Sequence, residues 1–227
     1  TGEWLKLVKQ KISDVKKRHK TPILVGGTGL YFKALTEGLV SFPKIPLQFR
    51  KKIRNLHKKL GPKNFFLRLI KEDPLAQNHI IPSDSQRAIR AFEVKLFTKK
   101  SMYEWFKNTK STYERGDFYK IYIDFPRDDL IKKINLRSRE MIKKGAISEV
   151  KKFIALKISK DKSVNKAIGI SEVKDYLHKK TEINDLVEKI SIKTRQYAKR
   201  QSTWARGNMI DWKKINPNAL SQILKKK

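Results

Sequence analysis

One short segment near the beginning of the chain constrains the fold more than any other. Residues 22–25, Pro-Ile-Leu-Val, predict a short buried strand, and three glycines then surround the hydroxyl of Thr28. A helix-like run follows over residues 30–39. Glycines let backbone N–H groups approach a ligand closely, and a helix N-terminus favours negative charge. Because open α/β folds bind ligands where their strands end, Thr28 is a candidate site residue.

The glycine turn, residues 26–29, has two interpretations on spacing alone. It suits the binding of an anion or a base edge, and it equally suits a plain tight turn between a strand and a helix. It is not a nucleotide-binding loop of the Gly-Lys-Ser/Thr kind, because no such triplet follows it, nor is it Gly-x-Gly-x-x-Gly. Both interpretations therefore stay open at this point.

The charge of the chain points to a polyanionic partner. Lysine and arginine number 54 against 22 aspartate and glutamate, a formal net charge of +32, and nucleic acid is the simplest such partner. The lysines are spread along the whole chain, however, and such a bias can extend over a genome. With no cysteine and four scattered histidines, the sequence offers no disulfide framework and no spacing typical of metal ligands. No apolar run reaches the length of a membrane span and no signal peptide opens the chain, so we expect a soluble, cytoplasmic protein.

Helical periodicity dominates most of the chain. Residues 4–18 predict an amphipathic helix before the 22–25 strand, and residues 44–112 show helical spacing broken by proline and glycine, with no strand signal. The alternating residues 119–125 predict a strand, and residues 210–212 a final short one. Strand, glycine turn and helix in succession are typical of an α/β fold.

The order of these elements predicts three parts. Residues 1–43 form a core part with a helix, a strand, the glycine turn and a helix. Residues 44–117 form an all-helical insertion domain, and residues 118–227 return to the core and carry basic C-terminal helices.

The last strong element, residues 184–206, separates apolar and cationic residues onto two halves of a helical wheel. No acidic residue after Glu188 balances the cations in this helix. Such a stripe is either a solvated face or a surface that binds a phosphate backbone. The cations concerned are Lys193, Arg195, Lys199, Arg200 and Arg206.

Four sequence blocks, taken together and in order, resemble the bacterial tRNA dimethylallyltransferases. They are Gly26-Gly-Thr-Gly-Leu-Tyr-Phe-Lys-Ala-Leu35, Asp84-Ser-Gln-Arg-Ala-Ile-Arg-Ala-Phe-Glu-Val94, Lys166-Ala-Ile-Gly-Ile170 and Thr194-Arg-Gln-Tyr-Ala-Lys-Arg-Gln-Ser-Thr-Trp-Ala-Arg206. Their order, their spacing and the helical insertion fit from about residue 4 to residue 212. Any one block is a weak signal, but four in register are a strong one.

The resemblance implies a fold and an activity. The fold class is α/β: a remnant of a P-loop-kinase-like core, of the ATP-binding, nucleotide-binding type, with an all-helical insertion domain, mostly helical overall. The activity is that of an isopentenyltransferase in tRNA modification. It transfers a dimethylallyl group from dimethylallyl diphosphate to N6 of adenosine 37 in tRNAs that read codons beginning with U.

The resemblance also implies roles for residues at matching positions. Thr28 is the catalytic position, near an adenine that has left the base stack. Arg137 and Lys166 are candidates for contacts to the diphosphate. The positions implied to contact tRNA are Arg50, Gln86, Arg87, Ala88, Ile89, Arg90, Lys166, Ala167, Ile168, Gly169, Ile170, Ser171, Lys199, Arg200, Gln201, Ser202, Thr203, Trp204, Ala205 and Arg206.

Two segments of the family do not occur in this sequence. Members begin with a Gly-Pro-Thr-x-x-Gly-Lys-Ser/Thr loop that binds the diphosphate, followed by a Ser-x-Asp-Ser segment whose Asp is the expected general base, and neither is found here. Ile170 also stands where the family usually has an aromatic residue. We therefore expect a fragment that holds the C-terminal part of such an enzyme, with the ligands of the family's Mg²⁺ in the missing N-terminal part and no metal ligand among these residues.

Three hypotheses about function remain open. The first is prenyl transfer, with tRNA and dimethylallyl diphosphate as partners and no membrane partner. The enzyme is then expected to be a monomer that could need an N-terminal piece, and whether this chain is active alone is open. The second is a catalytically inactive tRNA-binding remnant. The third is a general basic RNA-binding protein whose four blocks match by coincidence, for which replacing Thr28 should have no effect.

Overall fold

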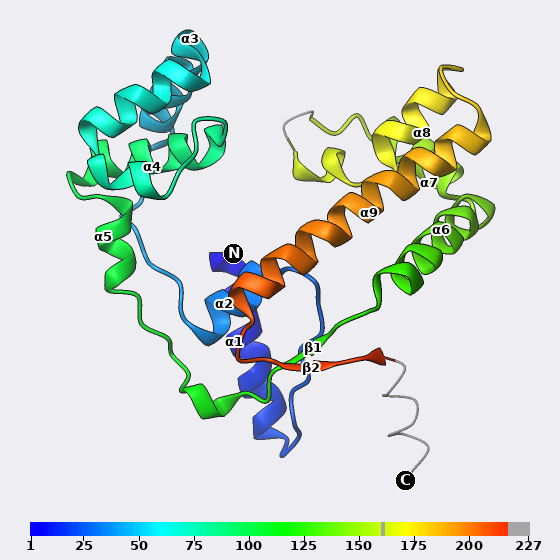
Figure 1. Cartoon of the computed structure of the whole chain (residues 1–227), viewed down its shortest axis with the longest axis horizontal. Coiled ribbons are helices and arrows are strands. Elements are labelled where there is room, and N and C mark those ends of the chain that lie inside the picture. The colour runs from blue at the N-terminus through cyan, green and yellow to red at the C-terminus, as the bar shows by residue number, and fades with distance from the viewer. Residues whose placement is uncertain (160–161, 218–227) are drawn as a thin grey trace. The chain divides into compact units, whose positions relative to one another are not determined.

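Helices make up most of the chain in this computed structural model, which describes residues 1–159 and 162–217 (Figure 1). In chain order the elements are α1 (Gly2–Lys17), α2 (Gly29–Thr36), α3 (Leu47–Glu72), the 3-10 turn η1 (Pro74–Asn78), α4 (Ser85–Thr98), α5 (Met102–Lys107), η2 (Arg115–Asp117), β1 (Ile121–Ile123), α6 (Arg127–Lys143), α7 (Ala146–Ala155), η3 (Ser163–Lys166), α8 (Ile170–Leu177), α9 (Ile183–Asn208) and β2 (Lys213–Ile215). No helix among the described residues combines the length and the apolar character that crossing a membrane requires.

The chain divides into two compact units. Unit one comprises Thr1–Leu24 and Leu30–Phe118, and unit two comprises Val25–Gly29 and the chain from Tyr119 onward. The glycine turn (residues 26–29) therefore belongs to the same unit as α6 to α9. The predicted division into residues 1–43, 44–117 and 118–227 stays a prediction.

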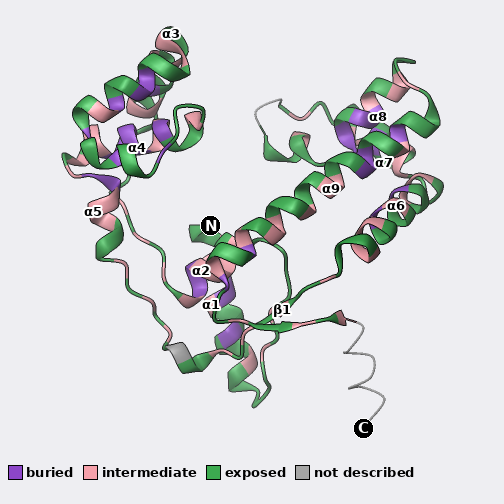
Figure 2. Cartoon of the chain, viewed as in Figure 1, coloured by how far each residue is buried: buried purple, intermediate pink, exposed green. Residues whose placement is uncertain are grey.

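The largest core of unit one joins α3 and α4. Phe65 of α3 and Phe92 of α4 are buried and meet edge to face with ring centroids 5.1 Å apart, and buried residues lie along both helices in Figure 2. One of the glycine and proline interruptions expected within residues 44–112 is a kink inside α3, where Gly61 has φ 72° and ψ 168° and Pro62 follows. Glycine tolerates this positive φ, and proline has no N–H to continue the helical hydrogen bonds.

The core of unit two joins α7, α8 and α9. Val150 of α7, Val173 of α8 and Leu186 and Ile190 of α9 are all buried and form one cluster. The last of these helices is the predicted amphipathic element, and its apolar stripe is what packs here. The long helices thus follow from local periodicity, because the spacing of apolar residues along a helix does not depend on what the helix packs against.

The predicted strand at residues 22–25 is not a strand in the structure. Ile23 is 84% exposed and Val25 is 92% exposed, and no strand among the described residues pairs with this segment. An apolar run forms a buried strand only where a neighbouring strand supplies hydrogen bonds and other elements cover its faces. The prediction that Thr28 follows the end of a strand is therefore wrong for this structure.

The sheet has two strands in the described part of the chain, and they are parallel. Ile121 pairs with Lys213 and Ile123 with Ile215. The strand predicted at 119–125 is thus confirmed in shorter form, whereas the one predicted at 210–212 begins three residues later. Residues 209–212 instead form a turn that leads out of α9, in which the Trp212 N–H donates to the Met209 carbonyl over 3.3 Å. The mostly helical character is confirmed, and descent from a P-loop core stays a prediction.

Candidate functional site

The glycine turn rests on the last turns of α9. The Gln201 side chain donates a hydrogen bond from Nε2 to the carbonyl oxygen of Gly27 over 2.8 Å. A Cβ added to Gly27 would lie 2.3 Å from that Nε2, and one added to Gly29 would lie 2.1 Å from ring carbons of Trp204. Neither glycine has a positive φ. Close approach of the Trp204 ring, and not backbone conformation, is therefore what requires glycine at position 29, whereas at position 27 a Cβ would meet only the movable end of the Gln201 side chain.

Thr28 is exposed between these two glycines. Its neighbours on either side are fixed by Gln201 and Trp204, so its backbone is placed by α9 and not by the end of a sheet. The turn and the C-terminal end of the basic helix, which the resemblance assigns to one site, do lie together in unit two.

The cations of α9 do not form one unbalanced stripe. Lys193 forms an ion pair with Glu172 of α8. Arg195 donates to Glu188 over 2.7 Å and to Asn135 of α6 over 2.8 Å. The sequence has no acidic residue after Glu188 in this helix, but α8 brings one carboxylate to Lys193, and Glu188, two turns back on α9, pairs with Arg195.

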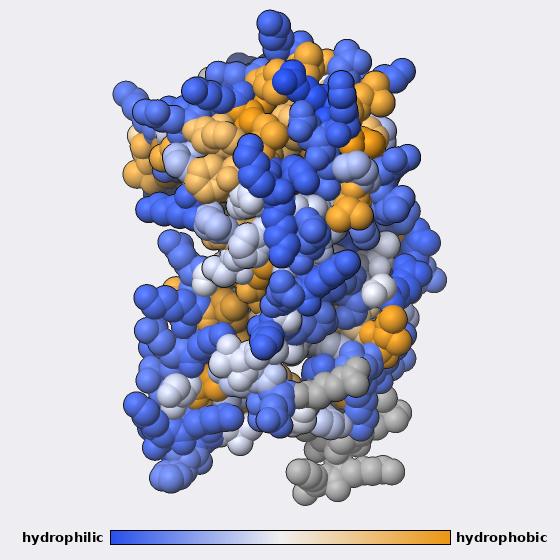
Figure 3. Space-filling view, turned by 90° about the vertical axis from the view of Figure 1, so that its left-hand side faces the viewer, coloured by the Kyte–Doolittle hydropathy of each residue, from blue (hydrophilic) through white to orange (hydrophobic). Residues whose placement is uncertain are grey.

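The other cations of α9 are exposed. Lys199 and Arg206 are exposed, and Arg200, also exposed, lies over the Tyr197 ring with its guanidinium carbon 5.7 Å from the ring centroid. Hydrophilic side chains likewise predominate on the face of the molecule drawn in Figure 3, with apolar groups between them. Within residues 199–206, Ala205 is buried and Gln201 and Trp204 face the glycine turn, so this block does not present a single surface.

The block at residues 166–171 is anchored by a buried carboxylate that the sequence analysis missed. Glu172 is 3% exposed and accepts hydrogen bonds from the Gly169 N–H over 2.8 Å, from Ser171 Oγ over 2.7 Å and from Lys193. Gly169 has φ +105°, a conformation that favours glycine. Ile170 is buried, whereas Lys166, Ala167 and Ile168 are exposed. A glycine followed three residues later by glutamate at a helix start was the available signal, because it resembles a capping box.

Burial and hydrogen bonding act in opposite directions on Glu172. Burial alone raises the pKa of this carboxyl, but the hydrogen bonds from Lys193, Ser171 and the Gly169 backbone outweigh it, so the pKa lies below its ordinary value. The carboxylate is thus held in its charged form, which keeps Lys193 and the start of α8 joined.

A second buried carboxylate organises three arginines in unit one. Glu93 of α4 is 1% exposed, and the nearest nitrogens of Arg50, Arg90 and Arg54 lie 3.2, 3.4 and 3.9 Å from its oxygens. The three arginine side chains are themselves 36, 38 and 56% exposed. Arg50 and Arg90 were predicted from the resemblance, whereas Arg54 and Glu93 were missed. Their signal was helical spacing: residues 50 and 54 share one face of α3, and residues 90 and 93 one face of α4.

The rest of the block at residues 86–90 divides between surface and core. Gln86 and Arg87 are exposed, and Arg87 lies 3.3 Å from Asp84, whose carboxylate caps α4 by accepting from the Arg87 N–H. Ala88 is 1% exposed and belongs to the core, and Ile89 packs against that core. The side chains available to a partner here are thus Gln86, Arg87 and Arg90.

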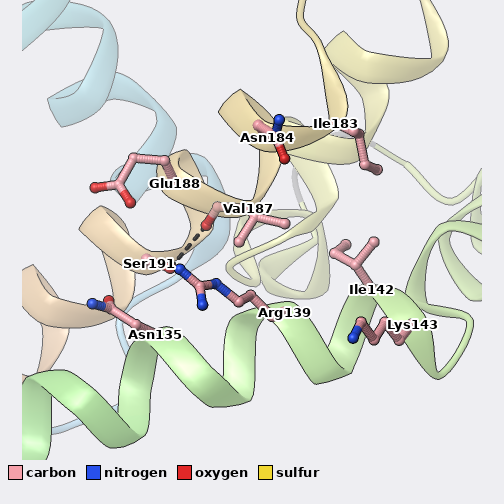
Figure 4. Close-up of a pocket in the computed structure, with 9 residues that line it drawn as sticks. All are labelled: Asn135, Arg139, Ile142, Lys143, Ile183, Asn184, Val187, Glu188 and Ser191. Atoms are coloured by element: carbon pink, nitrogen blue, oxygen red, sulfur yellow. Dashed lines mark hydrogen bonds between the residues drawn. The ribbon is translucent and has the colours of Figure 1, made fainter.

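The two predicted diphosphate contacts lie on different elements of unit two. Arg137 is exposed on α6 and Lys166 is exposed in η3, and no hydrogen bond or ion pair among the described residues joins them. A separate hollow of about 470 Å³ lies between α6 and α9. Arg139 reaches into it from α6 toward Ser191 of α9 (Figure 4). Its full lining is Asn135, Arg139, Ile142, Lys143, Ile183, Asn184, Val187, Glu188 and Ser191.

The described residues contain no group of three or more histidine, aspartate or glutamate side chains close enough together to hold a metal ion. The carboxylates of Glu93 and Glu172 are each occupied by cationic side chains. The part of the chain that the structure describes therefore offers Mg²⁺ no cluster of three such ligands.

Comparison with known proteins gives consistent matches over the whole chain. The model of a family described as IPP transferase matches residues 1–208. The chain is 53% identical over 226 residues to a tRNA dimethylallyltransferase of Pelagibacter ubique, covering 100% of this chain and 72% of that protein. It is 37% identical over 219 residues to a tRNA dimethylallyltransferase of Agrobacterium fabrum, covering 96% and 74%.

Two solved structures are similar as well. A tRNA delta(2)-isopentenylpyrophosphate transferase of Staphylococcus epidermidis matches with a TM-score of 0.57 and 27% identity, over 99% of this chain and 76% of that one. A eukaryotic dimethylallyltransferase acting on tRNA matches with a TM-score of 0.73 and 26% identity, over 89% of this chain and 51% of that one.

Proposed function

This chain belongs to the IPP transferase family, and on that premise we propose that it transfers a dimethylallyl group to tRNA. The donor is dimethylallyl diphosphate, and the acceptor is N6 of adenosine 37 in tRNAs that read codons beginning with U. The observation that carries the proposal is the contact between the glycine turn and α9. It brings the exposed Thr28 beside a helix end with three exposed cations, Lys199, Arg200 and Arg206.

The reaction forms one bond and breaks another. The N6 nitrogen attacks the allylic carbon, the bond from that carbon to the diphosphate oxygen breaks, and the proton that N6 loses passes to the departing diphosphate. An adenine N6 amine is a poor nucleophile, so catalysis needs an acceptor at N6, cations around the leaving diphosphate and exclusion of water. We assign the Thr28 hydroxyl to N6, where it accepts a hydrogen bond and orients the nitrogen.

Binding of the acceptor requires two kinds of contact. The adenine has to leave the anticodon-loop stack before Thr28 can reach N6. Cations bind the phosphates on either side and fix the register of the RNA, without reading its sequence. We assign this role to the cations of the predicted set, which are exposed or partly exposed: Arg50, Arg87, Arg90, Lys166, Lys199, Arg200 and Arg206.

The diphosphate contacts are proposed with the same chemistry. Arg137 and Lys166 carry fixed positive charge into solvent, where each can stabilise the charge that develops on the leaving group. Mg²⁺ bound to a diphosphate would neutralise part of its charge, and the described residues offer it no group of three carboxylate or histidine ligands.

The specific alternative is a tRNA-binding protein without transfer activity. It is favoured by the exposed cations of α9 and of the Glu93 cluster, which bind phosphates whether or not a reaction follows. This alternative shares the tRNA surface with our proposal and lacks only the chemistry at Thr28.

Transfer to unmodified tRNA distinguishes the two functions. The chain is incubated with dimethylallyl diphosphate, Mg²⁺ and tRNA, and the Pelagibacter ubique relative serves as positive control. The RNA is then digested, and the masses of its fragments are measured by mass spectrometry. We expect the adenosine at position 37 to gain the mass of one dimethylallyl group. A tRNA with guanosine at that position is the negative control, because it has no N6 amine.

Two variants refine the result. Thr28→Ala should reduce transfer by about tenfold to a hundredfold, the cost of one hydrogen bond to the reacting group, and Thr28→Ser should retain most of it. If this chain binds tRNA but transfers nothing where the relative succeeds, the tRNA-binding alternative is correct.

A further inference from the structure

We propose that Gln201 and Trp204 are positioning residues that hold the glycine turn on α9, so that one helix both presents Thr28 and binds the RNA. This inference rests on the proposed function for its consequence in catalysis, but its structural part stands alone. It also differs from the roles that the resemblance implies, since it turns both side chains toward the protein and away from tRNA.

The contact between Gln201 and Gly27 fixes the peptide that leads into Thr28. The donated hydrogen bond is 2.8 Å long and ends on the carbonyl immediately before that residue. An amide side chain has both a donor and an acceptor, and here the donor is the part in use. A side chain of similar size without an N–H would fill the same space beside the turn but would lose the hydrogen bond to the Gly27 carbonyl.

Trp204 closes the other side of the turn. Its ring carbons lie where a Cβ of Gly29 would stand, at 2.1 Å, so the ring is in direct contact with the Gly29 backbone. The Trp204 side chain is half-buried at this position. A large ring against a backbone excludes water from one side of the turn and restricts its movement. Thr28 is thereby held between two fixed neighbours while its own side chain stays exposed.

The positioning residues alternate with exposed cations along two turns of α9. Lys199 and Arg200 precede Gln201, and Arg206 follows Trp204 by two residues. Successive residues of a helix differ by about a quarter of a turn in direction, so one segment serves two surfaces. The segment of α9 that binds RNA phosphates is therefore the same segment that sets the position and orientation of Thr28.

Hydrogen exchange tests the structural part on the full chain. In Gln201→Met the amides of residues 25–29 should exchange about threefold to tenfold faster than in the parent, the loss expected for one hydrogen bond. Gln196→Met is the matched control, because Gln196 is exposed on the same helix, five residues before Gln201. Equal exchange of the turn in the parent and both variants would overturn the inference.

A second pair of variants tests the Trp204 contact without changing Trp204. Gly29→Ala places a methyl group where it overlaps the Trp204 ring, whereas Gly207→Ala adds one on α9 where nothing lies within 4 Å. Gly29→Ala should raise exchange of the turn and Gly207→Ala should not. Folding of each variant is checked by the unchanged exchange of α6, which lies in the same unit as both substitutions.

Measurements of tRNA affinity and of transfer rate then distinguish a positioning role of Gln201 from direct contact with the RNA. If Gln201 positions Thr28, Gln201→Met lowers the transfer rate at saturating tRNA by about tenfold and changes the dissociation constant for tRNA by less than about twofold. If the side chain contacts RNA, affinity falls and exchange of the turn does not change, which contradicts the inference. If the parent itself transfers nothing, the proposed function fails, and the exchange experiment still decides the positioning role.

Discussion

The guanidinium of Arg50 lies 3.2 Å from the carboxylate of Glu93, a side chain that is only 1% exposed. Because Arg90 and Arg54 approach the same carboxylate, one buried charge holds three partly exposed arginines in fixed positions and leaves the cluster with a net positive charge. A guanidinium has five N–H donors in a planar fork, so each arginine keeps donors for another acceptor. The cluster is thus a structural tie between α3 and α4, and we propose that its remaining donors bind phosphate.

Replacing the carboxylate should weaken the tie. We expect Glu93→Gln to reduce the free energy of unfolding by about 2 kcal/mol, because the arginines lose a charged acceptor while their exposed ends remain in solvent. Urea unfolding followed by circular dichroism measures the change. Glu149→Gln, an exposed position on α7, is the control, and equal midpoints for the two variants would contradict the prediction.

Removing one cluster arginine should change the salt dependence of tRNA binding. Arg54→Gln is expected to lower the slope of log affinity against log salt by about 1, the effect of losing one phosphate contact. Arg68→Gln removes the same charge from an exposed position on the same helix, outside the cluster. Fluorescence titrations at several salt concentrations compare the two. Equal slopes would mean that general charge, and not the cluster, binds the RNA.

The buried Glu172 should make stability depend on pH. Its pKa is below the ordinary value of 4.5 in the folded protein, so its contribution to stability is present above that value and is lost as the pH falls through the folded pKa. Denaturant midpoints of the parent and of Glu172→Gln should therefore differ at neutral pH and converge in acid. A constant difference between them at every pH would count against this account.

The kink in α3 depends on one glycine. Gly61 has φ 72° and ψ 168°, a region that side chains with a Cβ avoid, so Gly61→Ala should cost about 1–3 kcal/mol of stability. Gly207→Ala, inside α9 with open space around it, should be neutral or slightly stabilising by comparison. Thermal unfolding of both variants checks the contrast, and equal melting temperatures would contradict it.

The sequence was sufficient for those features that depend on neighbouring residues. Helical spacing predicted α1, α9 and the helical character of residues 44–112, and Asp84 caps α4 by accepting a hydrogen bond from the Arg87 N–H over 3.1 Å. The kink at residues 61–62 followed from the identity of two residues. The family followed from four blocks in order, and the comparisons confirm it. These features are local because helix periodicity, caps and breakers act over a few residues.

Only the tertiary structure decided which side chains meet. Glu172 and Lys193 are 21 residues apart in the chain, Arg50 and Glu93 are 43 apart, and Gly27 and Gln201 are 174 apart. A local pattern does not say which cation finds a carboxylate, so the basic stripe of α9 was predicted as uniform when two of its members are paired. The apolar residues 22–25 were likewise predicted as a strand, yet a strand exists only if another strand lies beside it. The sequence determined the helices and the family, and packing against Trp204 determined why position 29 has to be glycine.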